Sequence, residues 1–241
     1  MRSTNFWFFI LAILILLNLV SGHPPYILQT LLTNPPVAIS IILGLIIGIS
    51  VHEFAHAWVA YRLGDPTAKL EGRLTLNPQA HLDPVGTMAL IFLGFGWGKP
   101  TPFDPFNLRN VKRDSALISV AGAASNFLIA IVFSLPYLAA FYTQSLNSTI
   151  NTIYDYLSPV IFFNILLGVF NLIPIHPLDG FKVLAGLLPR DWYYDFMQTE
   201  RYGIFILLIL IVTPPGLIGK IILPISSNIF NFLMPGYAPI F

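Results

Sequence analysis

Two histidines and a glutamate interrupt an otherwise apolar run, in the segment Val51-His52-Glu53-Phe54-Ala55-His56. In a helix, residues four apart share one face, so His52 and His56 would present two imidazoles to one point. This is the H-E-x-x-H pattern, in which the histidines bind zinc and the glutamate between them handles protons. Ionisable groups within a membrane helix are costly and are usually functional, so the apolar context strengthens the metal interpretation.

A catalytic zinc site needs a third protein ligand and keeps one position open for water. The chain has no cysteine, so every ligand must come from histidine, aspartate or glutamate. Asp179 is the best candidate, because it follows a long apolar run that Pro174 and Pro177 interrupt, and because Gly180 lets the chain turn. The alternative is that Asp179 is a helix-end carboxylate paired with Lys182, at the spacing of common exposed pairs.

The composition is that of a polytopic membrane protein. Of the 241 residues, 56% are hydrophobic and only 10% are charged, whereas soluble domains carry about 25% charged residues. The twelve lysines and arginines cluster in loops and form no patch that would bind nucleic acid. We therefore expect an all-α polytopic membrane protein with about five to six transmembrane helices, embedded in the lipid bilayer.

Hydrophobic runs predict the helices that position these residues. Residues 6–20 predict a first transmembrane helix, with a cleaved signal peptide as the alternative, and the proline-rich residues 23–36 predict an outside loop. Further spans are predicted at residues 37–61, 116–142, 159–175 and 202–223, the last interrupted by Pro214-Pro215-Gly216 and followed by a half-span or surface tail from Pro224. The expected division is an N-terminal helix and loop (1–36), a catalytic membrane core (37–190) and C-terminal transmembrane segments (191–241).

Basic loops predict the orientation in the membrane. Residues 62–81, 103–114 and 182–201 carry the lysines and arginines typical of cytoplasmic loops, whereas residues 143–158 carry none and should face outward. The apolar run at residues 85–97 is too short to cross and predicts a re-entrant element. With a rise of about 1.5 Å per residue, His52 and His56 would lie roughly 7–14 Å inside the cytoplasmic end of their helix, at a depth that Asp179 can reach.

These motifs together resemble the site-2 protease family of intramembrane metalloproteases. The resemblance rests on the H-E-x-x-H segment and on Asn171-x-x-Pro174 leading to Leu178-Asp179-Gly180, and it extends over residues 37–190. The chain is similar to a compact prokaryotic branch without an appended recognition domain. The resemblance implies a three-helix catalytic core that cleaves transmembrane substrates. It also implies one Zn²⁺ per chain held by His52, His56 and Asp179, with Glu53 as acid–base and Asn171 assisting the substrate or its tetrahedral intermediate.

Three other polar residues have open roles. His176 stands where such sequences often have proline. It either packs in the core, or orients the metal ligand Asp179, or is an extra metal ligand. Asn126 lies among small residues within a predicted span and predicts an interhelical hydrogen bond. His81 predicts a structural role in its polar loop.

Residues 70–76 and 96–103 are candidate edge strands to which an extended substrate could add.

Three functions compete for this pattern. The first is an intramembrane zinc endopeptidase that cleaves a transmembrane protein or peptide. Such an enzyme would be an integral, multi-pass protein of the prokaryotic cell membrane, with its active site toward the cytoplasm. The second is a metal or proton transporter that uses the same His, Glu and Asp cluster. Transporters usually show repeated halves and a polar pathway, and the sequence contains no internal repeat. The third, a silent scaffold, leaves the polar cluster unexplained. The sequence predicts no oligomeric state.

Overall fold

The structure is a computed structural model that describes residues 26–93, 96–212 and 217–238. Within these ranges the chain is mostly helical and forms no β-strand. The predicted first helix at residues 6–20 and the interruption at Pro214-Pro215-Gly216 lie outside the described residues.

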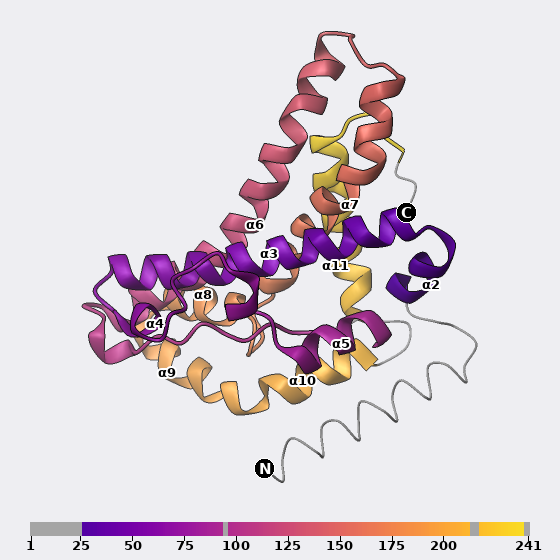
Figure 1. Cartoon of the computed structure of the whole chain (residues 1–241). Helices are drawn as coiled ribbons and strands as arrows, with labels where there is room; N and C mark the ends of the chain where they lie inside the picture. The colour runs from indigo at the N-terminus through magenta and orange to yellow at the C-terminus, as the bar shows by residue number, and fades with distance from the viewer. Residues whose placement is uncertain (1–25, 94–95, 213–216, 239–241) are drawn as a thin grey trace.

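The helices have the following bounds in chain order: α2 (Tyr26–Thr33), α3 (Pro35–Arg62), α4 (Thr67–Leu70), α5 (Pro84–Leu93), α6 (Val111–Tyr142), α7 (Ser148–Asn171), α8 (Asp179–Leu187), α9 (Arg190–Gln198), α10 (Glu200–Val212) and α11 (Leu217–Leu233). Two short 3-10 helices lie in the loops, η1 (Pro78–Ala80) and η2 (Pro105–Asn107). By length and composition, α3, α6 and α7 could each cross a membrane. Figure 1 shows α6 and α7 projecting together from the body, with α3 running past their base.

Helices α3, α6 and α7 pack against one another, and α8 packs against α6. Small residues permit the close approach of these helices, as expected in membrane bundles. A Cβ atom at Gly44 of α3 would lie only 2.9 Å from the Cα atom of Val160 on α7. The predicted span at residues 37–61 is confirmed as part of α3, which Pro35 begins.

Helix α7 is longer than the sequence predicts. It begins at Ser148, whereas the prediction placed an outside loop at residues 143–158 and began the span at Pro159. The polar residues after Asn147 are helical because the Asn147 side chain caps the helix, accepting a hydrogen bond from the Ile150 amide at 3.0 Å. The helix also ends earlier than predicted, at Asn171.

Helix α6 also begins before its predicted start at residue 116. Asn110 caps it by accepting a hydrogen bond from the Arg113 amide at 3.1 Å, so the charged residues that follow belong to the first turn. The expected loop at residues 23–36 is wrong as well, because it contains α2. That helix has no proline of its own, and the Pro35-Pro36 pair instead begins α3.

The C-terminal region differs from the single interrupted span predicted at residues 202–223. It forms two helices, α10 and α11. Pro224, expected to begin a tail, lies inside α11. A proline in a helix removes one hydrogen bond without requiring the helix to end, and here the apolar sequence continues it.

The run predicted to be re-entrant begins with α5 and then returns toward its start. Gly98 forms an isolated antiparallel bridge with Leu82, and the Lys99 amide donates to the His81 carbonyl at 2.7 Å. Both ends of the run therefore lie together. The candidate strands at residues 70–76 and 96–103 are wrong, because within the described ranges this bridge stands alone and residue 70 ends α4.

An aromatic cluster joins the last turns of α6 to the first turns of α7. Pro136 interrupts the hydrogen bonding of α6, and the Tyr154 hydroxyl from α7 inserts there. It accepts a hydrogen bond from the Tyr137 amide at 3.1 Å and donates one to the Phe133 carbonyl at 3.0 Å. Tyr237 packs edge-on against Tyr137, which attaches the end of the chain to the pair. We call this region the aromatic end.

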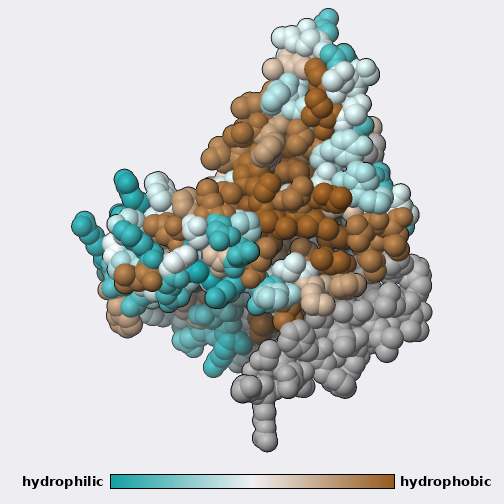
Figure 2. Space-filling model, in the orientation of Figure 1, coloured by the Kyte–Doolittle hydropathy of each residue, from teal (hydrophilic) through white to brown (hydrophobic). Residues whose placement is uncertain are grey.

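The outward faces of the long helices are apolar. On α6, Leu128 is 60% exposed and both Val132 and Leu135 are 53% exposed. Figure 2 shows apolar side chains over the middle of this face, with polar ones gathered near α4 and at the tip of the α6–α7 pair. Exposed apolar surface of this extent marks contact with a membrane or a partner. Its position between two polar zones is compatible with a membrane protein.

Candidate metal centre

Three predicted ligands converge on one point. His52 and His56 lie one turn apart on α3, and Asp179 is the first residue of α8. The Nε2 atoms of the two histidines are 2.9 Å apart, and Asp179 Oδ2 lies 3.0 Å from the Nε2 of His52 and 3.2 Å from that of His56. Tetrahedral bonds near 2.0–2.1 Å would place zinc ligands about 3.3 Å apart. The three atoms thus have nearly the spacing that one zinc ion requires.

The chemistry of the three atoms also fits a cation. His52 Nδ1 lies 2.7 Å from Asn126 Oδ1, and His56 Nδ1 lies 2.7 Å from the Ile118 carbonyl oxygen. Both partners are acceptors, so each Nδ1 carries a hydrogen, and in the neutral ring each Nε2 then turns a lone pair inward. Asp179 Oδ2 is buried and has no hydrogen-bond donor within the described residues. Three buried acceptors facing one another are unfavourable unless a cation lies between them.

The turn between α7 and α8 brings Asp179 to this point. Helix α8 begins at Asp179, where the helix dipole favours a negative charge. A Cβ atom at Gly180 would lie 2.2 Å from the Leu172 carbonyl oxygen, so the turn packs directly on the first residues of α8. Gly180 therefore acts by close approach, since the positive-φ glycines of the described chain lie elsewhere.

Helix α6 passes directly against the two imidazoles. A Cβ atom at Gly122 would lie 2.5 Å from His56 Cε1 and 2.6 Å from His52 Cε1, so no larger residue fits without a shift. The sequence showed a run of small residues here but gave no reason to connect Gly122 with the histidines. That connection requires knowing which face of α6 meets α3.

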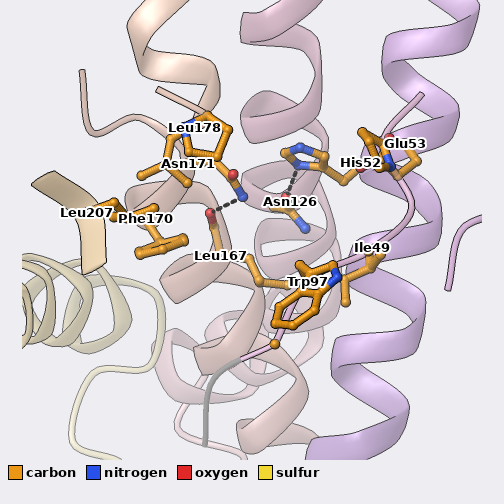
Figure 3. Close-up of a pocket in the computed structure, with 14 residues that line it drawn as sticks. Ile49, His52, Glu53, Trp97, Asn126, Leu167, Phe170, Asn171, Leu178 and Leu207 are labelled. Atoms are coloured by element: carbon orange, nitrogen blue, oxygen red, sulfur yellow. Dashed lines mark hydrogen bonds between the residues drawn. The ribbon is translucent and has the colours of Figure 1, made fainter. Parts of the chain in front are cut away.

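Glu53 lines a cavity of about 350 Å³ together with His52 and Asn171 (Figure 3). Its Oε2 atom accepts a hydrogen bond from the Thr101 amide at 2.7 Å, and the Thr101 hydroxyl donates to the Glu53 carbonyl at 3.1 Å. The sequence did not predict this contact with Thr101. No hydrogen bond joins Glu53 to a histidine in the described part of the chain, and the bond from Thr101 is to Oε2.

Polar loops fix the segment that contains Thr101. Arg73 is only 4% exposed and donates to the Lys99 and Pro100 carbonyl oxygens, the second at 3.2 Å. Asp65 Oδ2 accepts a hydrogen bond from the Asp104 amide at 2.8 Å. Burial acts to raise the pKa of Asp65, but its several hydrogen bonds outweigh burial and hold the pKa below the usual value. These hydrogen bonds therefore hold in place the loop segment whose Thr101 contacts Glu53.

Asn171 is the last residue of α7 and reaches the cavity, as Figure 3 shows. Its Nδ2 atom donates to the carbonyl oxygen of Leu167, one turn earlier, at 3.0 Å. One amide hydrogen is thus held by its own helix, and among the described residues the other has no acceptor.

The remaining candidates have structural contacts. His176 Nδ1 lies 3.4 Å from Glu200 Oε1, and its ring packs edge-on against Phe181. The acidic and histidine group that could hold a metal contains His52, His56 and Asp179 and not His176, which favours packing over an extra ligand. Burial lowers the pKa of His176. His81 is fully buried with Nε2 at 2.7 Å from the Thr75 carbonyl oxygen, and it stabilises its loop as expected.

Lys182 does not pair with Asp179 as the alternative reading required. Its ammonium group lies 4.1 Å from the centroid of the Phe103 ring. Burial lowers the pKa of Lys182, and the nearby charges of Asp179 and Glu200 only partly oppose that effect. Asp179 Oδ2 instead faces the imidazoles.

Comparison with known proteins places this geometry in a family. The model of peptidase family M50 matches residues 40–212. YwhC of Bacillus subtilis, provisionally named a zinc metalloprotease, is 39% identical over 178 residues, which cover 73% of this chain and 81% of that protein. Rip2 of Mycolicibacterium smegmatis, also provisionally named a zinc metalloprotease, is 28% identical over 183 residues, with coverage of 74% and 68%. No solved structure gives a significant match.

Proposed function

The chain belongs to peptidase family M50, the site-2 protease family, and is a zinc metalloprotease; from this premise we propose that it hydrolyses peptide bonds of transmembrane substrates within the bilayer. The observation that carries the proposal is the convergence of His52, His56 and Asp179 at the junction of three apolar helices. A soluble peptidase would not need to bury this centre among helices with apolar outer faces.

We assign a role to each residue of the site. His52 Nε2, His56 Nε2 and Asp179 Oδ2 bind one zinc ion, and the cavity beside them admits water and the substrate carbonyl. Zinc supplies Lewis acidity there and activates water near neutral pH. Glu53 accepts the proton of the attacking water at Oε1 and delivers it to the leaving amine. Asn171 directs its second amide hydrogen to the oxygen that gains charge.

The proposed membrane arrangement keeps the predicted orientation. In this proposal residues 37–190 form the catalytic core, and the site lies toward the cytoplasmic side of a prokaryotic cell membrane, an orientation that the basic loops favour. The close approach of the ends of residues 85–97 supports an element that enters and leaves on one side. With α3, α6 and α7 as core spans, the remaining helices would bring the total to about five or six crossings.

The deciding experiment compares the purified protein with Glu53→Gln on a transmembrane reporter. Because the amide cannot accept the proton of water, cleavage should fall by about 10²–10⁴-fold while zinc content stays near one per chain. His52→Ala is the matched control and should lose both. Full cleavage by Glu53→Gln would remove Glu53 from its assigned role, and zinc flux into vesicles without cleavage would favour transport.

A further inference from the structure

Two fully buried asparagines connect the metal centre to the helix backbones behind it. Asn126 of α6 and Asn164 of α7 are both 0% exposed. Asn126 Oδ1 lies 2.7 Å from His52 Nδ1, and Asn126 Nδ2 donates to Asn164 Oδ1 at 3.1 Å. Figure 3 shows the Asn126 amide directly against the His52 ring. The sequence predicted an interhelical hydrogen bond for Asn126, which is confirmed, but gave no role to Asn164.

The direction of this chain of hydrogen bonds is fixed at its far end. Asn164 Nδ2 donates to the carbonyl oxygens of Val160 at 2.8 Å and of Gly44 at 3.2 Å. Carbonyl oxygens only accept, so the amide of Asn164 cannot be flipped and its Oδ1 must face Asn126. Asn126 Nδ2 likewise meets the Gly48 carbonyl oxygen at 3.1 Å. Its Oδ1 is therefore the atom that faces His52.

This direction determines the hydrogen on the ring of His52. Asn126 Oδ1 can only accept, so His52 Nδ1 must carry a hydrogen, and in the neutral ring Nε2 then keeps its lone pair. Nε2 is the atom that lies 3.0 Å from Asp179 Oδ2. The ring is thus held in the one tautomer that can bind a metal at that point.

Two glycines of α3 allow this arrangement. A Cβ atom at Gly48 would lie 2.8 Å from Asn164 Oδ1, and one at Gly44 would lie 2.9 Å from Val160 Cα. Both glycines thus let α7 approach closely. The Gly44 carbonyl oxygen accepts from Asn164 of α7, and the Gly48 carbonyl oxygen accepts from Asn126 of α6. His52 follows Gly48 by one turn, so the supporting carbonyls and the ligand lie along one face of α3.

We propose that Asn126 and Asn164 are positioning residues that act in series to fix the tautomer and ring orientation of His52 for zinc. Asn126 acts on His52 directly, and Asn164 acts only through Asn126. The proposal rests on the zinc site assigned above. A purely structural role for the same hydrogen bonds would lower stability without a selective effect on zinc affinity.

The test measures zinc affinity of the purified full-length variants by competition with a chromophoric chelator. Asn126→Leu removes the acceptor for His52, so affinity should fall by about 10–100-fold, as for other residues that orient metal ligands. Asn126→Asp keeps an acceptor at that position but loses both donated bonds. Its affinity should stay within about threefold of the original even though its thermal stability falls.

Asn164→Leu should lower the affinity less than Asn126→Leu, because the amide of Asn126 remains but can now rotate. The double variant should be no worse than Asn126→Leu alone, since residues that act in series are not additive. Tyr154→Phe is the matched control, because it removes another buried α6–α7 hydrogen bond far from the ligands and should leave zinc affinity unchanged. If Asn126→Leu fails to fold, Asn164→Leu and Asn126→Asp still provide the comparison.

Two results would overturn the proposal. One is an equal loss of affinity in Asn126→Asp and Asn126→Leu, which would assign the effect to packing. The other is no loss in Asn126→Leu or Asn164→Leu beyond that in Tyr154→Phe. His52→Ala separates this failure from failure of the zinc site itself. Unchanged zinc binding in His52→Ala would refute the zinc site and not only the positioning role of Asn126 and Asn164.

Discussion

The metal centre and the aromatic end both bury polar groups between α6 and α7, but their hydrogen bonds end differently. At the aromatic end, the Tyr154 hydroxyl both accepts and donates, and each of its partners is a backbone group of α6. At the metal centre, the bonds run through Asn126 to His52 and stop at lone pairs that face Asp179 Oδ2. One network is closed, and the other leaves acceptors without a donor.

Within one pair of helices, this difference separates buried polar groups that stabilise the fold from buried polar groups that bind a ligand. A closed network satisfies a helix that a proline has interrupted, so its benefit is stability alone. A network that ends at unpaired acceptors lowers stability in the absence of a cation and is retained for what it binds. Variants in the two regions should therefore affect different properties.

Gly122→Ala should have the largest effect and should fall on the metal centre. The added methyl would lie 2.5 Å from His56 Cε1, so the imidazoles must shift and zinc affinity should fall by about 10–100-fold. Gly219→Ala in α11 is the matched control, because among the described residues its new Cβ would meet nothing closer than Leu223 Cδ1 at 3.9 Å. Chelator competition measures the affinity, and normal zinc binding by Gly122→Ala would contradict the contact.

Tyr154→Phe should have an effect that is confined to stability. Removing the hydroxyl leaves the Phe133 carbonyl and the Tyr137 amide without this partner, at a cost of about 1–3 kcal/mol. Tyr156→Phe, at a side chain that is 44% exposed, is the control and should change little. Thermal unfolding in detergent measures the difference. A loss of zinc in Tyr154→Phe would erase the distinction between the two regions.

Ionisation of Tyr237 should produce the smallest effect, a loss of stability that develops only at alkaline pH. Burial raises the pKa of Tyr237 to about 12, and the carboxylate of Asp155, which its hydroxyl contacts at 2.9 Å, adds to the increase. The folded protein therefore holds this proton more tightly than the unfolded chain does. The resulting stabilisation is complete below the ordinary pKa of 10.0 and is lost as pH rises toward 12.

Tyr237→Phe tests that pH dependence. The variant lacks the titrating group, so the difference between its melting temperature and that of the original protein should shrink as pH rises from 9 to 11.5. A difference that stays constant over this interval would show that the proton on Tyr237 does not stabilise the fold.

The parts of the fold that depend on local pattern could be predicted from the sequence. The apolar run containing His52 predicted α3 closely, and the spacing of His52 and His56 predicted that their side chains share a face. The start of α7 could not be predicted from hydropathy, because a capping side chain at Asn147 and not an apolar stripe begins it.

The supporting residues of the site depend on contacts between helices. Asn164 stood in the sequence as a polar residue within an apolar run, which is a signal of function or packing. Its connection to His52 depends on the register of α7 against α3, and a single sequence does not contain that register. The same limit applies to Gly122, whose role appears only when α6 lies against both imidazoles.

The hydrogen bond that Glu53 receives comes from the main chain of the tripeptide Pro100-Thr101-Pro102. Proline has no amide hydrogen, so Thr101 offers the sole N–H among these three residues. Sliding the segment by one position in either direction would present the carboxylate with a ring carbon in place of a donor. The two prolines thus exclude neighbouring registers, and Glu53 can accept this hydrogen bond in only one register of the segment Pro100-Thr101-Pro102.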